Sequence, residues 1–283
     1  MTTKGLIAID IDGTLTSVRD HLPEPVSTFL HDLNKKGWKI LFVTGRTLRW
    51  SLELLNQLPF GYFLSCFNGA YTTMQPEGTS LKKRYLTYDQ VMKVMSLIVD
   101  EDVGVAFYGP ADLEARPFLF CHYASHVLQN HLRKRSRALK ERYKEVISLS
   151  ELPVESFSAV RFFCLPHTAK KLSLDVEDKL RLNSPRMKDS YDDSFSVVQV
   201  TQAQVSKGEA MNTVVAHMGK CRHTIACGDD FNDISMLESA DIAVVMTGAP
   251  SEVLELGDII APPASENGII TGLKNALVLL EKK

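Results

Sequence analysis

Short apolar runs alternate with longer amphipathic segments in the first third of this chain of 283 residues. The apolar runs at residues 6–10, 38–43 and 62–66 predict buried strands, and the segments at 23–36 and 47–57 predict helices between them. Alternation of strand and helix at this spacing is typical of a parallel sheet with crossover helices. We therefore expect an α/β fold.

The same alternation returns near the end of the chain. Residues 196–200, 223–227 and 242–245 predict strands, and residues 207–218, 232–239, a segment near Ser251 and 267–280 predict helices. The middle lacks this order: we expect strands at 103–108 and 159–164 and helices at 88–100, 118–130, 133–146 and 167–180. We interpret residues 84–191 as an inserted α+β module in a core made of 1–83 and 192–283.

Composition and charge are ordinary for a globular enzyme. Hydrophobic residues make up 45% and charged residues 23% of the chain, and 32 basic against 34 acidic side chains leave a net charge of −2. We expect no nucleic-acid or membrane partner, because nothing global attracts one and no apolar stretch approaches the ~20 residues of a spanning helix. The start of the chain does not have the pattern of a signal peptide. The five scattered cysteines, none in C-x-x-C spacing, favour reduced thiols and a cytoplasmic location.

Two carboxylates follow the first predicted strand. Asp10 and Asp12 stand two residues apart, so an extended backbone directs both side chains into one small volume. Two like charges repel there, and a buried carboxylate costs several kcal/mol unless it is compensated. A divalent cation is the natural compensation.

Other predicted strands also end in polar residues: Thr44, Asn68 and the pair Asp229/Asp230, while Lys207 begins a predicted helix. In open parallel sheets, ligands bind outside the carboxyl ends of the strands, which predicts one shared site. Each residue taken alone has a simpler reading. Thr44 suits a turn before glycine, Asn68 suits a hairpin turn, and Lys207 suits a solvated helix start.

Four short motifs together carry a resemblance. They are Asp10-Ile-Asp12-Gly-Thr, Val-Thr44-Gly45-Arg46, Ser-Lys207-Gly, and Gly-Asp229-Asp-Phe-Asn232-Asp233. In this order the chain resembles the haloacid dehalogenase (HAD) superfamily of phosphohydrolases, over about residues 5–75 and 195–280. The insert and the Asn68-Gly-Ala and Glu266-Asn-Gly-Ile segments resemble its Cof-type branch. That resemblance implies a Rossmann-like parallel-sheet core with an inserted α+β cap domain.

The resemblance also implies roles. Asp10 would be the nucleophile that forms an aspartyl-phosphate, and Asp12 would act as general acid and base. Mg²⁺ would be held by Asp10, the main-chain carbonyl of Asp12 and Asp229, with Asp233 and Asn232 orienting its water ligands. We expect substrate or phosphate binding by a larger set: Thr44, Gly45, Arg46, Asn68, Lys207 and Asn232. The simpler reading of Arg46 is that it braces neighbouring loops.

Three segments receive no role. Residues 243–249 lack the Met-Gly-Asn order usual after this strand in the branch. The basic segment from Arg133 to Lys144 has a solvated helix face as its default reading, with attraction of anionic substrates as the alternative. His122 and His126 have the i,i+4 spacing of a zinc pair but lack the glutamate of the H-E-x-x-H motif, so a surface or core-edge role is favoured.

The expected function is a magnesium-dependent phosphatase that hydrolyses a small phosphorylated metabolite such as a sugar phosphate. One alternative is a phosphosugar mutase, because the segment from Asp12 with Arg19 nearby resembles phosphomannomutases, although their fourth motif is longer and richer in glycine. The other is a non-catalytic small-molecule binding protein, which would usually have lost Asp10 or Asp12. The sequence does not define the oligomeric state.

Overall fold

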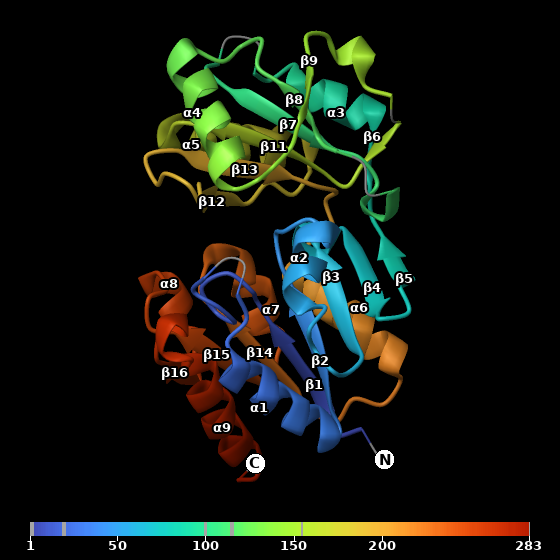
Figure 1. Ribbon diagram of the computed structural model, residues 1–283, viewed down its shortest axis with the longest axis vertical. Helices are drawn as coiled ribbons and strands as arrows, with labels where there is room; N and C mark the ends of the chain where they lie inside the picture. The colour runs from blue at the N-terminus through green and yellow to red at the C-terminus, as the bar shows by residue number, and fades with distance from the viewer. Residues whose placement is uncertain (1–2, 19–20, 99–100, 114–115, 154, 283) are drawn as a thin grey trace. The chain divides into compact units, whose positions relative to one another are not determined.

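The computed structural model describes residues 3–18, 21–98, 101–113, 116–153 and 155–282, which form two compact units. The first unit combines Met1–Lys83 with Ser206–Lys283, and the second is Arg84–Val205 (Figure 1). Arg19 lies outside the described residues. Each unit has its own sheet.

The first unit contains an eight-stranded sheet in the order β16-β15-β14-β1-β2-β3-β4-β5. The first six strands in this order are parallel to one another. At the other edge, β4 is antiparallel to β3, and β5 is antiparallel to β4. The parallel strands are β1 (Gly5–Ile9), β2 (Trp38–Val43), β3 (Tyr62–Cys66), β14 (Thr224–Gly228), β15 (Ile242–Met246) and β16 (Ile259–Ala261). The edge strands are β4 (Tyr71–Gln75) and β5 (Thr79–Lys83).

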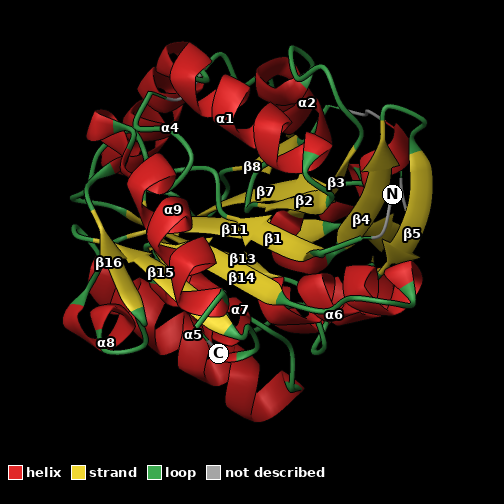
Figure 2. Ribbon diagram, turned by 90° about the horizontal axis from the view of Figure 1, so that it is seen from below, coloured by secondary structure: helices red, strands yellow, loops and turns green. Residues whose placement is uncertain are grey.

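Helices cover both faces of this sheet. The helices α1 (Glu24–Lys35), α2 (Leu48–Leu55) and α9 (Gly268–Leu280) lie on one face, and α6 (Lys207–Met218), α7 (Ile234–Glu238) and α8 (Ser251–Leu254) lie on the other (Figure 2). Alternate residues of β2 explain the division: Leu41 and Val43 join Met211 of α6 in one buried cluster. The inner strands β1, β2, β3, β14 and β15 are buried at almost every position, as continuous apolar runs predict, whereas the edge strand β5 is largely exposed.

The second unit has a six-stranded sheet in the order β12-β13-β11-β7-β8-β9. Its strands are β7 (Gly104–Tyr108), β8 (Phe118–Phe120), β9 (Lys144–Val146), β11 (Ala159–Cys164), β12 (Arg186–Lys188) and β13 (Ser196–Val200). Every pair is antiparallel except β8 with β9. The short strands β6 (Leu86–Thr87) and β10 (Ser156–Phe157) form a separate pair.

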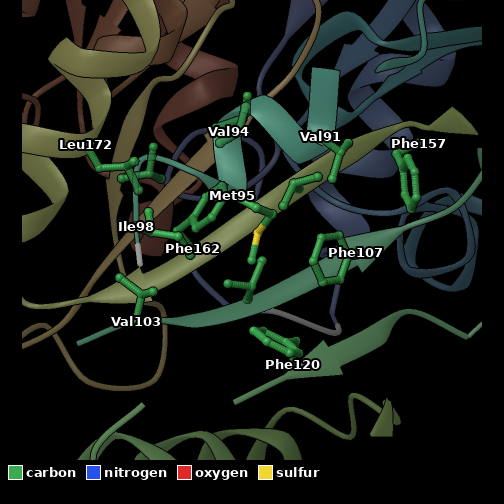
Figure 3. Close-up of a cluster of buried hydrophobic side chains, with 14 of the residues drawn as sticks. Val91, Val94, Met95, Ile98, Val103, Phe107, Phe120, Phe157, Phe162 and Leu172 are labelled. Atoms are coloured by element: carbon green, nitrogen blue, oxygen red, sulfur yellow. The ribbon is translucent and has the colours of Figure 1, made fainter. Parts of the chain in front are cut away.

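The core of the second unit lies between one face of this sheet and two helices, α3 (Tyr88–Met95) and α5 (Pro166–Leu180). Figure 3 shows Val91 and Met95 of α3 among the rings of Phe107 and Phe162. A third helix, α4 (His126–Ala138), buries Leu128 and Leu132, and a Cβ at Gly104 of β7 would come within 2.3 Å of Leu132.

The predicted α/β fold class is confirmed, but one strand lies in a different sheet from the one expected. β13, predicted as the return of the chain to the core, pairs with β11 and β12. Its residues Val198 and Val200 belong to the buried cluster of the second unit. The second unit therefore ends at Val205, not at residue 191.

The helix predicted at 118–130 is wrong. Phe118–Phe120 is the strand β8, with Phe118 and Phe120 buried in the cluster beside β7, and helix α4 begins only at His126. A short apolar run has no periodicity of its own, so pairing with β7 decides its structure. His122 precedes the helix, so His122 and His126 do not share a helical face. The helix predicted at 133–146 is also divided, because α4 ends at Ala138 and β9 follows.

The basic segment from Arg133 to Lys144 contains both exposed and buried side chains. Arg133, Lys134 and Arg137 are exposed, as its default reading predicts. Arg135 instead is 3% exposed, donates through Nε to Asp189 at 2.9 Å and also pairs with Glu141. A buried guanidinium needs such partners, which makes Arg135 a structural residue of the second unit.

Two observations bear on cellular environment. All five cysteines are free. Across the described ranges, no helix is both long enough and apolar enough to span a membrane.

Candidate active site

Neighbouring parallel strands of the first unit end together and place three predicted residues at one edge of the sheet. Ile9 of β1 is in register with Phe42 of β2 and Cys227 of β14. The first residue after each of these three strands is Asp10, Thr44 or Asp229, respectively after β1, β2 and β14. The backbone N–H of Asp10 extends the ladder by donating to the carbonyl of Cys227 at 3.0 Å.

A buried lysine joins two of the carboxylates. Nζ of Lys207, the first residue of α6, donates to Oδ1 of Asp10 at 2.5 Å and to Oδ1 of Asp233 at 2.6 Å. The three residues are 1%, 5% and 0% exposed, respectively. Solvent therefore cannot stabilise these charges, and the ammonium group stabilises both carboxylates. The simpler reading of Lys207 as a solvated helix start is wrong.

Asp233 is held by donors on both carboxylate oxygens. Its Oδ2 accepts the backbone N–H groups of Asp229 and Asp230, each at 3.0 Å, while Oδ1 accepts Lys207. A Cβ at Gly228 would lie 2.5 Å from Cβ of Asp233, so only glycine permits this approach. Asp233 thus fixes the turn that carries Asp229.

Asp229 is oriented by a hydroxyl that the sequence analysis did not assign. Oγ1 of Thr14, which is fully buried, donates to Oδ1 of Asp229 at 2.7 Å. Gly13, with φ of +90°, makes room, because a Cβ there would lie 2.3 Å from Oδ2 of Asp229. The only signal in the sequence was the position of Thr14 in the same motif as Asp10.

Burial and repulsion from neighbouring carboxylates raise the pKa values of Asp10 and Asp229. Burial raises the pKa of Asp10 well above its ordinary value; Lys207 opposes the shift, and Asp233 and Asp229 add to it. Burial and then Asp233 raise the pKa of Asp229 to about 6. Burial favours neutral Lys207, but Asp10 and Asp233 outweigh it and raise the pKa of Lys207 above its ordinary value. One ammonium group therefore leaves an excess of negative charge.

The arrangement fits a hard divalent cation. One carboxylate oxygen from each of Asp10, Asp229 and Asp233 lies within 4.8 Å of the others. Clustered carboxylate oxygens are the ligands that such cations prefer. Burial and neighbouring carboxylates raise the pKa values of Asp10 and Asp229, and a bound cation would offset this unfavourable charge.

Asp12 is exposed, unlike the buried cluster, although its charge also helps to raise the pKa of Asp10. Its side chain is 56% exposed, and its carboxylate accepts two hydrogen bonds from Arg46, from Nε at 2.8 Å and from Nη2 at 2.6 Å. In the structure, therefore, the guanidinium of Arg46 forms an ion pair with Asp12.

The loops after β2 and β3 bring the other predicted phosphate-binding residues together. The backbone N–H of Asn68 donates to the carbonyl of Thr44 at 2.8 Å, and Nδ2 of Asn232 donates to Oδ1 of Asn68 at 3.2 Å. Gly45 joins Thr44 to Arg46 in the first of these loops. The hairpin reading of Asn68 also holds, because it has φ of 56° in the turn Phe67–Gly69 between the antiparallel strands β3 and β4.

Nδ2 of Asn68 is a buried donor without a hydrogen-bond partner. Buried donors are normally paired, so this amide is a candidate donor to a ligand beside Thr44 and Asn232.

The loop at 246–249, atypical in sequence, is held by hydrogen bonds to the neighbouring strand β16. Thr247 donates through its backbone N–H and through Oγ1 to the carbonyl of Ala261, at 2.9 and 2.6 Å. These bonds tie the end of β15 to the end of β16.

Comparison with known proteins matches most of this chain to one family. The sequence model of the haloacid dehalogenase-like hydrolases matches residues 7–273. Pyridoxal phosphate phosphatase YbhA of Escherichia coli is 26% identical over 269 residues, which cover 92% of this chain and 93% of that protein. The 5-amino-6-(5-phospho-D-ribitylamino)uracil phosphatase YcsE of Bacillus subtilis is 22% identical over 280 residues, covering 95% and 94%.

A solved structure extends the similarity to the fold. The subclass IIB sugar phosphatase BT4131 superposes with a TM-score of 0.75 at 22% identity and covers 96% of this chain and 98% of its own. The fold of both units is thus one already known, and it agrees with the sequence expectation of an α/β core with an inserted sheet.

Proposed function

This chain belongs to the haloacid dehalogenase-like hydrolases as a phosphatase, and we propose that it uses Mg²⁺ to hydrolyse a small phosphorylated metabolite through an aspartyl-phosphate. The observation that carries the proposal is the buried cluster in which Lys207 contacts Asp10 and Asp233 beside Asp229. A nucleophilic carboxylate, a phosphate-binding ammonium group and metal ligands stand at one sheet edge, where ligands bind in such folds.

In the first step the carboxylate of Asp10 attacks phosphorus. A bond forms between its oxygen and phosphorus while the bond from phosphorus to the leaving oxygen breaks, and Asp12 gives that oxygen a proton. In the second step Asp12 takes a proton from water as the water oxygen attacks phosphorus. The aspartyl oxygen leaves, which releases inorganic phosphate and restores Asp10.

Mg²⁺ would be held by Asp10, Asp229 and the main-chain carbonyl of Asp12. When bound, it supplies the positive charge that the cluster lacks and stabilises charge on the phosphoryl oxygens. Asp233 has donors on both oxygens, which suits it to orient the site rather than to bind the ion directly.

The remaining predicted residues suit the phosphoryl oxygens. Lys207 is a charged donor at Asp10, and Nδ2 of Asn68 is a buried donor without a hydrogen-bond partner. Thr44 and Gly45 lie in the loop after β2, and Asn232, in the turn after β14, donates to Asn68. We therefore place these three residues with Asn68 in the phosphate site.

The substrate class rests on the relatives. YbhA is named for pyridoxal phosphate, YcsE for a phosphoribitylamino-uracil and BT4131 for sugar phosphates, which are all small phosphate esters. We therefore propose a small phosphorylated metabolite, with a sugar phosphate among the first to test. The free cysteines support the cytoplasmic location proposed with it.

Phosphate release tests the proposal. The purified protein is assayed with p-nitrophenyl phosphate and with a panel of sugar, nucleotide and cofactor phosphates, with Mg²⁺ and with EDTA. We expect Mg²⁺-dependent phosphate release that EDTA abolishes and Asp10→Asn removes. Asp32→Asn, on the exposed face of α1, is the matched control and retains activity.

Two results would contradict the proposal. Full activity in Asp10→Asn would exclude this nucleophile, and inactivity of the wild type across the panel would favour a binding protein. An isomerised product that depends on a bisphosphate activator, without phosphate release, would identify a mutase.

A further inference from the structure

The contact between Asp12 and Arg46 is not explained by the roles expected of these two residues. Both carboxylate oxygens of Asp12 accept from the guanidinium, Oδ2 from Nε at 2.8 Å and Oδ1 from Nη2 at 2.6 Å. The Arg46 side chain is 5% exposed, whereas that of Asp12 is 56% exposed. The buried partner is therefore the guanidinium of Arg46, and the exposed carboxylate of Asp12 is hydrogen-bonded to it.

The backbone of Arg46 is held at two points. Its N–H donates to Oγ1 of Thr44 at 3.1 Å, and its carbonyl accepts the N–H of Phe67 at 3.1 Å. The loops after β2 and β3 thus brace the residue from both sides. A buried guanidinium on a braced backbone has little freedom to turn toward another partner.

The pairing still leaves Asp12 able to exchange protons. A carboxylate oxygen has two lone pairs, and the fork of Arg46 occupies one on each oxygen. The remaining lone pairs are not used by Arg46, and the Asp12 side chain is 56% exposed. Proton transfer requires a donor within hydrogen-bond reach and in a fixed orientation, which an unsupported exposed side chain does not provide.

We propose that Arg46 is a positioning residue that fixes the carboxylate of Asp12 for proton transfer to the leaving group and from water, and that it does not bind the phosphoryl group. This inference rests on the proposed function. It replaces the expectation that Arg46 binds phosphate, and it explains why arginine stands here: lysine offers a single point charge and cannot hold two oxygens at once.

Two aryl phosphates that differ only in leaving-group basicity separate the two roles. Phenyl phosphate needs a proton at its leaving oxygen, whereas p-nitrophenolate leaves readily without one. General acid catalysis is worth about 10²–10⁴-fold, so we expect Arg46→Lys to lower kcat for phenyl phosphate by about 10²-fold. For p-nitrophenyl phosphate we expect a much smaller loss, and KM for both esters stays near the wild-type value.

The double variant provides the second readout. If Arg46 acts through Asp12, Asp12→Asn combined with Arg46→Lys is no slower than Asp12→Asn alone, because the second change removes nothing more. Arg49→Lys is the matched control: Arg49 is exposed on α2, pairs with Glu53, and its replacement leaves both rates unchanged.

Arg46→Ala guards against a folding defect. Added guanidinium restores part of its phenyl phosphate hydrolysis, and an equal concentration of methylammonium does not. The proposal is overturned by an equal loss on both esters with raised KM, by multiplying losses in the double variant, or by a folded Arg46→Ala without guanidinium rescue. A wild type inactive on both esters refutes the proposed function instead, whatever the variants do.

Discussion

At the scale of single residues, the site consists of charges that depend on one another. Lys207 is nearly fully buried and contacts two carboxylates, and Asp229 repels Asp233 across the same small volume. The sequence supplies residue types that fit metal and phosphate. The free energy of ionising these side chains depends on how deeply each one is buried. The alternation of strands and helices in the sequence does not give that depth.

Removing Lys207 should leave two buried carboxylates without their cation. We expect Lys207→Met to destabilise the metal-free protein by about 3–5 kcal/mol, the usual cost of breaking a buried ion pair from one side. Denaturant unfolding with and without Mg²⁺ measures the effect, and Mg²⁺ should recover part of the loss. Lys35→Met is the control, because Lys35 is exposed and 3.9 Å from Asp32. Equal stability of the two variants would contradict the burial argument.

The raised pKa of Asp229 predicts a pH dependence of stability. The folded pKa of about 6 lies above its ordinary value of 3.8, so the folded metal-free protein takes up a proton first as the pH falls. Stability should increase as the pH falls through 6 and decrease as it rises through 6. Asp10, whose pKa is also raised, acts in the same direction.

Thermal unfolding between pH 5 and 8 with EDTA measures this dependence. Asp229→Asn should flatten it, and Mg²⁺ should raise Tm more at pH 7.5 than at pH 5.5, because protons compete with the metal for the carboxylates. An unchanged pH profile in Asp229→Asn would show that the titration belongs elsewhere.

At the scale of elements, close packing of two helices positions Lys207. The N–H of Gly208 in α6 donates to Oγ of Ser235 in α7 at 3.1 Å, and a Cβ at Gly208 would lie 2.3 Å from the carbonyl oxygen of Ser235. Gly208 thus lets α6 pack closely against α7. We infer that this close packing also positions the neighbouring Lys207 at its buried site.

Gly208→Ala should separate α6 from α7. Overpacking of this kind costs about 1–3 kcal/mol, and we expect a matching loss of stability together with lower kcat as Lys207 is displaced. Denaturant unfolding and phosphate release measure the two effects. Gly248→Ala is the control, since a Cβ there meets nothing within 4 Å. Wild-type activity in Gly208→Ala would mean that Lys207 is placed independently of this contact.

At the scale of the whole molecule, two separate hydrophobic cores predict separable behaviour. Phe162 is fully buried in the second unit, whereas the carboxylates that could bind a metal ion belong to the first. We expect Phe162→Ala to cost about 3–5 kcal/mol, as truncation of a buried aromatic ring does. In calorimetry it should lower the unfolding transition of the second unit, and Mg²⁺ should raise only the transition of the first. Transitions that shift together in both experiments would show one cooperative unit.

The sequence by itself determined the family, the α/β fold class and which residues stand after the strands. Continuous apolar runs give buried strands, and in a parallel sheet the residues after adjacent strands meet at one edge, so Asp10, Thr44 and Asp229 were predictable. Local pattern was sufficient because these residues depend on strand register alone.

Only the tertiary structure decided contacts between segments that are distant in the chain. The sheet that β13 joins depends on pairing with β11, and β8 becomes a strand because β7 is its neighbour. The bonds from Thr14 to Asp229 and from Arg46 to Asp12 join different loops. Such contacts join residues that are distant in the chain, and no local pattern records them. The sequence therefore supplied the candidate site residues, and the structure showed which neighbour contacts each one.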